Sequence, residues 1–140
     1  MSARVFVHVV LAALLLGCGS GRQEAASLVE AVARFRRAEN SEKPTREQDI
    51  ENVACSDADV CETKRICEAA TRPTSEALRL KAQVERGLAD LEHGVIVKTD
   101  DAATALPKML DEAERLLAEG HDAMPACDKR VLELRARFGI

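Results

Sequence analysis

The sequence predicts an all-α fold, and three observations support this prediction. Ala, Leu, Glu and Arg fill much of the chain, whereas only 7 Gly and 4 Pro occur in 140 residues; the abundant types are strong helix formers. Apolar residues recur every three or four positions over most of the chain, as on one face of a helix. The only strand-type stretch is "GVIVK" at 94–98. We therefore expect a small helical bundle that contains an antiparallel helical hairpin and is stapled by disulfides.

Two helices are expected in the first third of the domain. In the stretch 23–40, Leu28, Val32 and Phe35 follow helical spacing. Glu stands early and Arg late in this stretch, as the helix dipole favours. The segment "NSEKPT" at 40–45 breaks this helix, and a second one begins at Pro44, with Ile50 and Val53 facing inward.

The middle of the chain predicts a corner and two further helices. Residues 55–75 indicate a turn followed by a helix from Ser56 or Asp57, which should stop before Pro73 because a residue preceding proline disfavours helix. The stretch 74–94 gives the clearest periodicity and ends at Gly94, a natural C-cap. Its apolar stripe comprises Ala77, Leu80, Val84, Leu88 and Leu91.

The last third predicts a long helix and a short one. After a loop at 95–100, Asp100 or Asp101 should cap a helix over 101–120 that ends at Gly120, with a kink or a late start at Pro107. A final helix over 122–140 places Cys127, Val131, Leu134 and Phe138 on one stripe. The two longest helices, 74–94 and 101–120, are joined by a short loop, which favours an antiparallel hairpin.

The beginning of the chain has the layout of a secretory signal. One Arg is followed by the apolar run Val5–Leu16 and then by small residues around Cys18. A helix of twelve residues is about 18 Å long. A bilayer core is about 30 Å thick, so a permanent membrane span is disfavoured.

The residues Leu15-Leu16-Gly17-Cys18 resemble the lipobox of bacterial lipoproteins. The resemblance implies cleavage between Gly17 and Cys18, a diacylglycerol on the Cys18 thiol, and a second acylation on its new amine. The absence of Asp at position 19 implies sorting to the outer membrane, with the domain facing the periplasm. Residues 1–17 would then be removed, residues 18–22 would form a lipidated tether, and residues 23–140 would form a single helical domain.

Four cysteines remain, and an even number in an exported chain suggests two disulfides. Cys61 and Cys67 lie six apart on one predicted helix, about 9 Å along its axis, whereas a bridge needs Cα atoms within about 7 Å. A Cys55–Cys67 bridge would require that helix to break. We therefore prefer Cys55–Cys61 with Cys67–Cys127. A four-thiolate metal site is the rival, but the ligand spacing fits it poorly.

No arrangement of residues in the sequence indicates catalysis. The motifs of serine hydrolases, zinc proteases and phosphate-binding loops are absent. His93 and His121 each follow the last turn of a predicted helix, and helix capping explains Asp57, Asp59, Asp100 and Asp101. The net charge of −4 and the absence of Trp and Tyr argue against nucleic-acid binding.

These observations predict a non-catalytic, lipid-anchored protein of the cell envelope with a structural or protein-interaction role. Its expected partners are the membrane, through the lipid on Cys18, and another envelope protein; no cofactor beyond that lipid and no metal is expected. The alternative is a small-ligand carrier with a cavity between helices, and a thiol enzyme or metal protein is a weaker third. The basic stretch 33–39 would be a solvated face or a contact for anionic headgroups.

Overall fold

The computed structural model describes the backbone of residues 3–140 and the side chains from residue 20 onward. This part of the chain folds into four helices and no strand: α1 (Ala3–Arg37), α2 (Lys43–Glu51), α3 (Ala58–Glu92) and α4 (Asp101–Phe138). The strand-type stretch 94–98 lies in the loop between α3 and α4. The predicted all-α class is confirmed.

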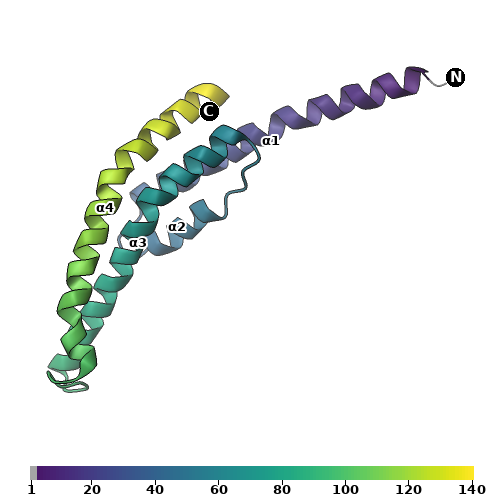
Figure 1. Ribbon diagram of the computed structural model, residues 1–140. Helices are drawn as coiled ribbons and strands as arrows, with labels where there is room; N and C mark the ends of the chain where they lie inside the picture. Colours follow the sequence, from purple (N-terminus) through teal and green to yellow (C-terminus); the bar gives the residue numbers. More distant parts are fainter. Residues whose placement is uncertain (1–2) are drawn as a thin grey trace.

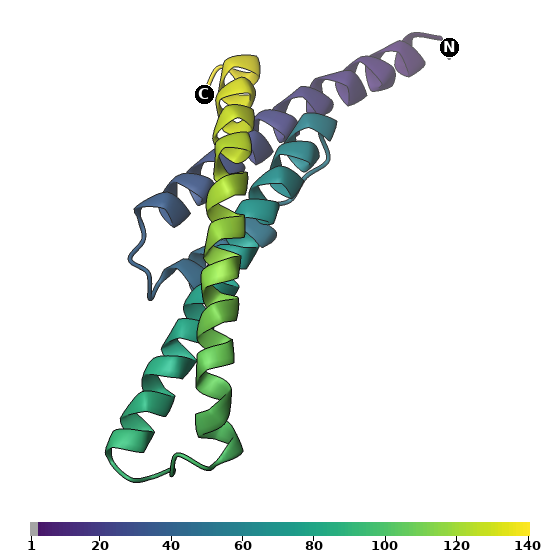
Figure 2. The same ribbon diagram turned by 60° about the vertical axis from the view of Figure 1, so that its left-hand side comes forward.

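Helices α3 and α4 form the predicted antiparallel hairpin (Figures 1 and 2). Helices α1 and α2 pack against the half of this hairpin that holds the C-terminus and the start of α3. The other half, with the loop that joins α3 to α4, extends beyond both of them in the two views. The protein therefore has a layered body and a projecting two-helix arm.

The core lies in the body, where all four helices meet. Its fully buried members include Phe35 and Leu28 from α1, Ile50 from α2 and Val60 from α3. Leu134 of α4 and the buried pair Cys67 and Cys127 complete it. The stripe predicted from Leu28, Val32 and Phe35 therefore faces the core because α1 must cover the hairpin on one side.

Helix α3 does not stop before Pro73, so that expectation is wrong. The helix is continuous from Ala58 to Glu92, with Pro73 inside it. The ring removes the bond that the carbonyl of Ala69 would accept, but Ala69 lies at the surface, where water can hydrate that carbonyl. Burial of Ala70, Thr71, Ser75 and Ala77 on both sides of the proline holds the helix together.

Helix α4 also continues where two elements were expected. It runs from Asp101 to Phe138 through Pro107, Gly120 and Pro125, so it neither starts late at Pro107 nor ends at Gly120. Gly120 is buried, and a Cβ added to it would lie 2.8 Å from the backbone oxygen of Ala70 and would also meet Oγ1 of Thr74. The missing side chain of Gly120 therefore allows α3 and α4 to approach closely, and Gly120 does not end a helix.

The segment expected to be a short tether belongs to α1. Residues 20–22 are helical and contact the far end of the chain: Nη2 of Arg22 donates to the carbonyl of Gly139 at 3.1 Å. A Cβ on Gly21 would lie 3.4 Å from the Phe138 ring. The C-terminal end of α4 therefore lies beside the stretch that immediately follows Cys18.

No helix within the described part of the chain has both the length and the apolar character needed to cross a membrane.

Candidate interaction surface

The cysteine predictions have two outcomes. The proposed lipidation site Cys18 and the cleavage site Gly17–Cys18 lie outside the residues whose side chains are described. The preferred disulfide pairing is confirmed: Cys55 bonds Cys61, with Cα atoms 5.2 Å apart, and Cys67 bonds Cys127, with Cα atoms 4.6 Å apart. Among the described residues there is no group of side chains that could hold a metal ion.

The histidines and aspartates at helix ends mostly perform the predicted capping. Nδ1 of His93 lies 2.7 Å from the carbonyl oxygen of Ala89 at the end of α3. The Asp57 carboxylate accepts from the backbone N–H of Asp59 and of Val60, which caps α3. Asp100 differs, because its carboxylate accepts from the N–H of Val97 in the loop instead of capping α4.

Two other candidates, His121 and Asp59, cap no helix end. His121 was expected to follow the last turn of a helix, but it lies inside the continuous α4, where its Nδ1 is 3.4 Å from Oδ1 of Asp122. Asp59 and Asp57 both pair with Arg137 of α4, which ties the start of α3 to the end of α4. Asp57 and Asp59 therefore stabilise the packing of α3 against α4.

One buried carboxylate was not predicted from the sequence. Glu47 of α2 is 3% exposed and faces α3, where its Oε2 lies 3.5 Å from Nη2 of Arg79 and its Oε1 lies 3.8 Å from Nε of Arg72. Thr71 and Ser75 are fully buried on α3, and neither hydroxyl has a hydrogen-bond partner. Helix α2 carries three acids, Glu47, Asp49 and Glu51, among other polar residues, and this sequence has no periodic signal that would mark Glu47 as buried.

Two acids of α2, Glu47 and Glu51, have pKa values shifted in opposite directions. Burial, followed by the neighbouring Glu51 carboxyl, raises the pKa of Glu47 above its ordinary value of 4.5. The hydrogen bonds from Arg72 lower the pKa of Glu51. Ionised Glu47 therefore weakens the packing of α2 on α3 at neutral pH, whereas ionised Glu51 strengthens it.

We expect Glu47→Gln to raise the melting temperature at pH 7, because it removes the burial of a charge. The gain in melting temperature should vanish below about pH 4. Glu47 is then protonated in the wild type as well, so neither protein buries a charge at this position. Thermal melts followed by circular dichroism at pH 4 and pH 7 measure this difference.

Glu51→Gln is the matched control, with the opposite sign. Because folding lowers the pKa of Glu51, its ionised form stabilises the fold above pH 4.5, and this stabilisation is lost as the pH falls below that value. It should therefore lower the melting temperature at pH 7 and lose this effect in acid. Equal losses from both variants at pH 7 would contradict the assignment.

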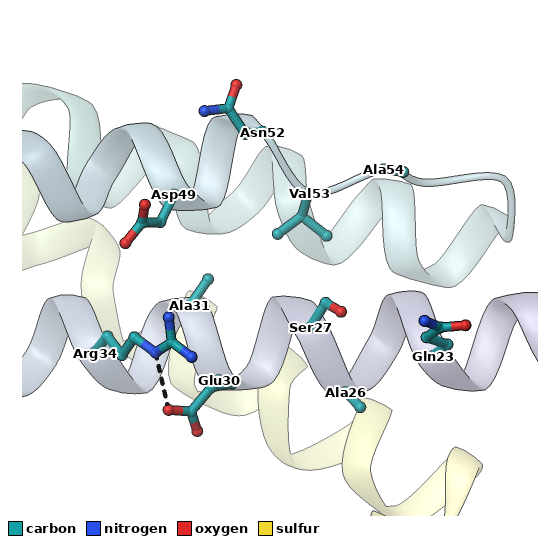
Figure 3. Close-up of a pocket in the computed structure, with 10 residues that line it drawn as sticks. All are labelled: Gln23, Ala26, Ser27, Glu30, Ala31, Arg34, Asp49, Asn52, Val53 and Ala54. Atoms are coloured by element: carbon teal, nitrogen blue, oxygen red, sulfur yellow. Dashed lines mark hydrogen bonds and ion pairs between the residues drawn. The ribbon is translucent and has the colours of Figure 1, made fainter.

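A groove runs between α1 and the segment from α2 to residue 54 (Figure 3). Its volume is about 610 Å³. One wall presents Gln23, Ser27 and the paired Glu30 and Arg34 of α1, and the other presents Asp49, Asn52, Val53 and Ala54. The groove is therefore a shallow, mixed polar surface, and its Glu30 and Arg34 already neutralise each other.

The arm of the hairpin carries a different surface, which we call the hairpin tip: Leu88, Val95, Val97 and Leu110. Their exposed fractions are 54%, 71%, 57% and 38%. Leu88 belongs to the stripe predicted to be buried, and Leu110 to the apolar face of the following helix. Both are exposed because only two helices are present in the arm, and two helices cannot cover each other's whole apolar width.

The charged residues of the arm differ from those of the body. Among the described residues, the ion pairs of α3 extend no further than Arg79–Glu76, and those of α4 begin again at Glu112–Arg115. Between these points, residues 80–111 contain six acidic and four basic residues, none of which forms an ion pair in the described structure. The exposed apolar residues of the tip therefore lie in a region whose charged side chains form no ion pairs.

Comparison with known proteins finds no family model, no curated relative and no solved structure that matches this chain.

Proposed function

We propose that this protein is a lipid-anchored, non-catalytic docking protein of the bacterial cell envelope. The lipid would be attached to Cys18, and the helical domain would face the periplasm from the outer membrane. The single observation that supports a docking role best is the projecting arm, whose tip exposes Leu88, Val95 and Val97. Large exposed apolar surfaces are typical of protein interaction sites.

The architecture fits this role in a second way. The bridged Cys67 and Cys127 belong to the core that α1 also enters, and the arm of the hairpin extends beyond the body (Figure 1). Residues 20–22 and the C-terminus meet at one end of the molecule, and the tip lies at the other end. An anchor at Cys18 would therefore leave the tip directed away from the membrane.

The small-ligand carrier has less support. The hollow of about 610 Å³ is an open groove with a mixed polar lining, whereas carrier sites for apolar ligands are enclosed and mainly apolar. A second hollow of about 500 Å³ lies between α1, α3 and α4 and includes Arg36, Asp128 and His121 on its wall. Neither offers the dry cavity that the carrier requires.

The basic stretch 33–39 gives little support to a headgroup contact. Arg34 and Arg37 both pair with Glu30, and Arg36 pairs with Asp128. Phe35 is buried in the core. The three arginines of this stretch are therefore engaged in ion pairs with Glu30 and Asp128.

Cys18→Ala tests the anchor. We expect the variant to carry no lipid and to keep residues 1–17, because the thiol that would receive the lipid is gone. Metabolic labelling by a fatty acid and the mass of the chain measure these two effects. Cys55→Ala combined with Cys61→Ala is the control, because it removes an unrelated bridge and should leave the labelling unchanged. A Cys18→Ala protein that still carries label would refute the proposal.

A further inference from the structure

We infer that the hairpin tip docks a protein partner whose contact surface is apolar at its centre and basic at its rim. This inference rests on the proposed docking function and assigns its site and the chemistry of its partner. It follows from the exposed apolar residues of the tip, from the charges around them, and from the position of the tip in the molecule.

The exposed apolar residues come from three elements that follow one another in the chain. Leu88 comes from the last turns of α3, Val95 and Val97 from the loop, and Leu110 from α4. The loop is held in shape by its own backbone, because the N–H groups of Val95 and Ile96 both donate to the carbonyl of Asp90, and Val97 donates to Asp100. The valines are therefore presented on an ordered turn.

The rim is acidic. Asp90 and Glu92 precede the loop, and Asp100 and Asp101 follow it, while Lys98 is the only Lys or Arg between them. All five side chains are exposed, and none forms an ion pair within the described part of the chain. In the body, Glu30, Glu51 and Glu62 pair with arginines, whereas Glu39 and Glu42 do not. Unpaired acids around an apolar centre favour a partner with Lys or Arg at its rim.

The same charges disfavour two other occupants. A second copy docked tip to tip would bring its own Asp90, Glu92, Asp100 and Asp101 against this rim, and like charges at an interface are unfavourable. An anionic lipid surface would be repelled for the same reason. Helix α3, with its 35 residues, would also hold the tip roughly 50 Å from the end at which α1 would be anchored.

The experiment places a photo-reactive amino acid at Val97 in the full chain, within the native envelope. The same group at Ala69, an exposed residue of α3 in the body, serves as the matched position. The cross-linked peptides are identified by mass spectrometry. We expect adducts at Val97 with another protein, on a segment in which Lys or Arg flanks apolar residues.

Charge-reversal variants then test the acidic rim. Asp90→Lys with Glu92→Lys should lower the yield of the Val97 adduct about tenfold, as expected for two exposed ion pairs. These changes place cations at the end of α3, where the helix dipole favours them, so the fold is retained. Glu39→Lys with Glu42→Lys changes the net charge equally at two exposed, unpaired acids of the body and should leave the yield unchanged.

Each other outcome overturns the inference in a distinguishable way. Adducts with a second copy of this chain or with phospholipid would assign the tip to another occupant. Equal loss in both charge variants, or loss in neither, would show that the acidic rim does not select the partner. Adducts at Ala69 alone would show that the protein docks its partner through the body and not through the tip, which would refute this inference but agree with the proposed docking function. An absence of protein adducts at both positions would refute the docking function as well.

Discussion

Replacing both Cys67 and Cys127 with alanine is expected to lower the free energy of unfolding by about 4 kcal/mol. The bridge joins residues 60 apart in sequence, and a cross-link over a loop of that length removes much of the entropy of the unfolded chain. Both side chains are fully buried. Alanine is chosen because a serine hydroxyl would bury an additional polar group.

Urea unfolding under non-reducing conditions measures this loss, with Cys55→Ala and Cys61→Ala as the control. That bridge joins residues only 6 apart in sequence, and its Cys55 end is exposed, so we expect a loss of about 2 kcal/mol. Equal losses in the two double variants, or a negligible loss for the long bridge, would contradict the view that Cys67–Cys127 holds the body together.

Gly120→Ala is expected to destabilise the protein by about 2 kcal/mol, although alanine is the better helix former. The added Cβ would lie 2.8 Å from the carbonyl oxygen of Ala70 and 3.2 Å from the backbone nitrogen of Thr74. Backbone atoms cannot rotate away, and the Cys67–Cys127 bridge nearby opposes any separation of the helices. Thermal and urea unfolding of the variant provide the measurement.

Gly87→Ala is the matched control for Gly120→Ala. Gly87 lies inside α3 and also faces α4, but its added Cβ would meet only the side chain of Leu106, at 2.6 Å from Cδ2. That side chain can change rotamer, and the gain in helix propensity offsets part of the cost. We expect a change well under that of Gly120→Ala. A Gly120→Ala protein as stable as the wild type would contradict the close packing of α3 against α4.

Local rules were sufficient to predict most of the fold. Helical spacing placed Leu28, Val32 and Phe35 in the core, and Gly94 ends the α3 region with a φ of 69°. The separation limit for bridged Cα atoms excluded Cys61–Cys67 on one helix and made Cys55–Cys67 depend on a break in that helix, which left the observed pairs. These predictions succeeded because each depends on a few neighbouring residues.

The errors arose where packing outweighed local preference. Pro73 and Gly120 were expected to end helices, yet both lie inside them because the neighbouring residues are buried between helices. Leu88 was expected in the core, and it is exposed because no third layer covers the arm. Glu47 shows no pattern in the sequence that predicts burial. Only the positions of other helices decide these four cases.

The candidate site could be predicted only in part for the same reason. The sequence shows that "GVIV" at 94–97 is apolar, but not that it lies at the end of a projecting arm with unpaired charges around it. The proposed lipid anchor, unlike the tip, can be predicted from the sequence without the fold. Its prediction depends on the local motif around Cys18 alone, and the fold neither requires nor opposes it.

The intact mass of the full-length protein, expressed in a bacterium, extracted from its membranes and measured with and without reduction, tests the proposed anchor and the two bridges together. We predict a chain that begins at Cys18, carries the added mass of a diacylglycerol with or without a further acyl group, and gains four hydrogens on reduction of its two bridges. A chain that retains residues 1–17, or one that begins at Cys18 without lipid, would contradict it.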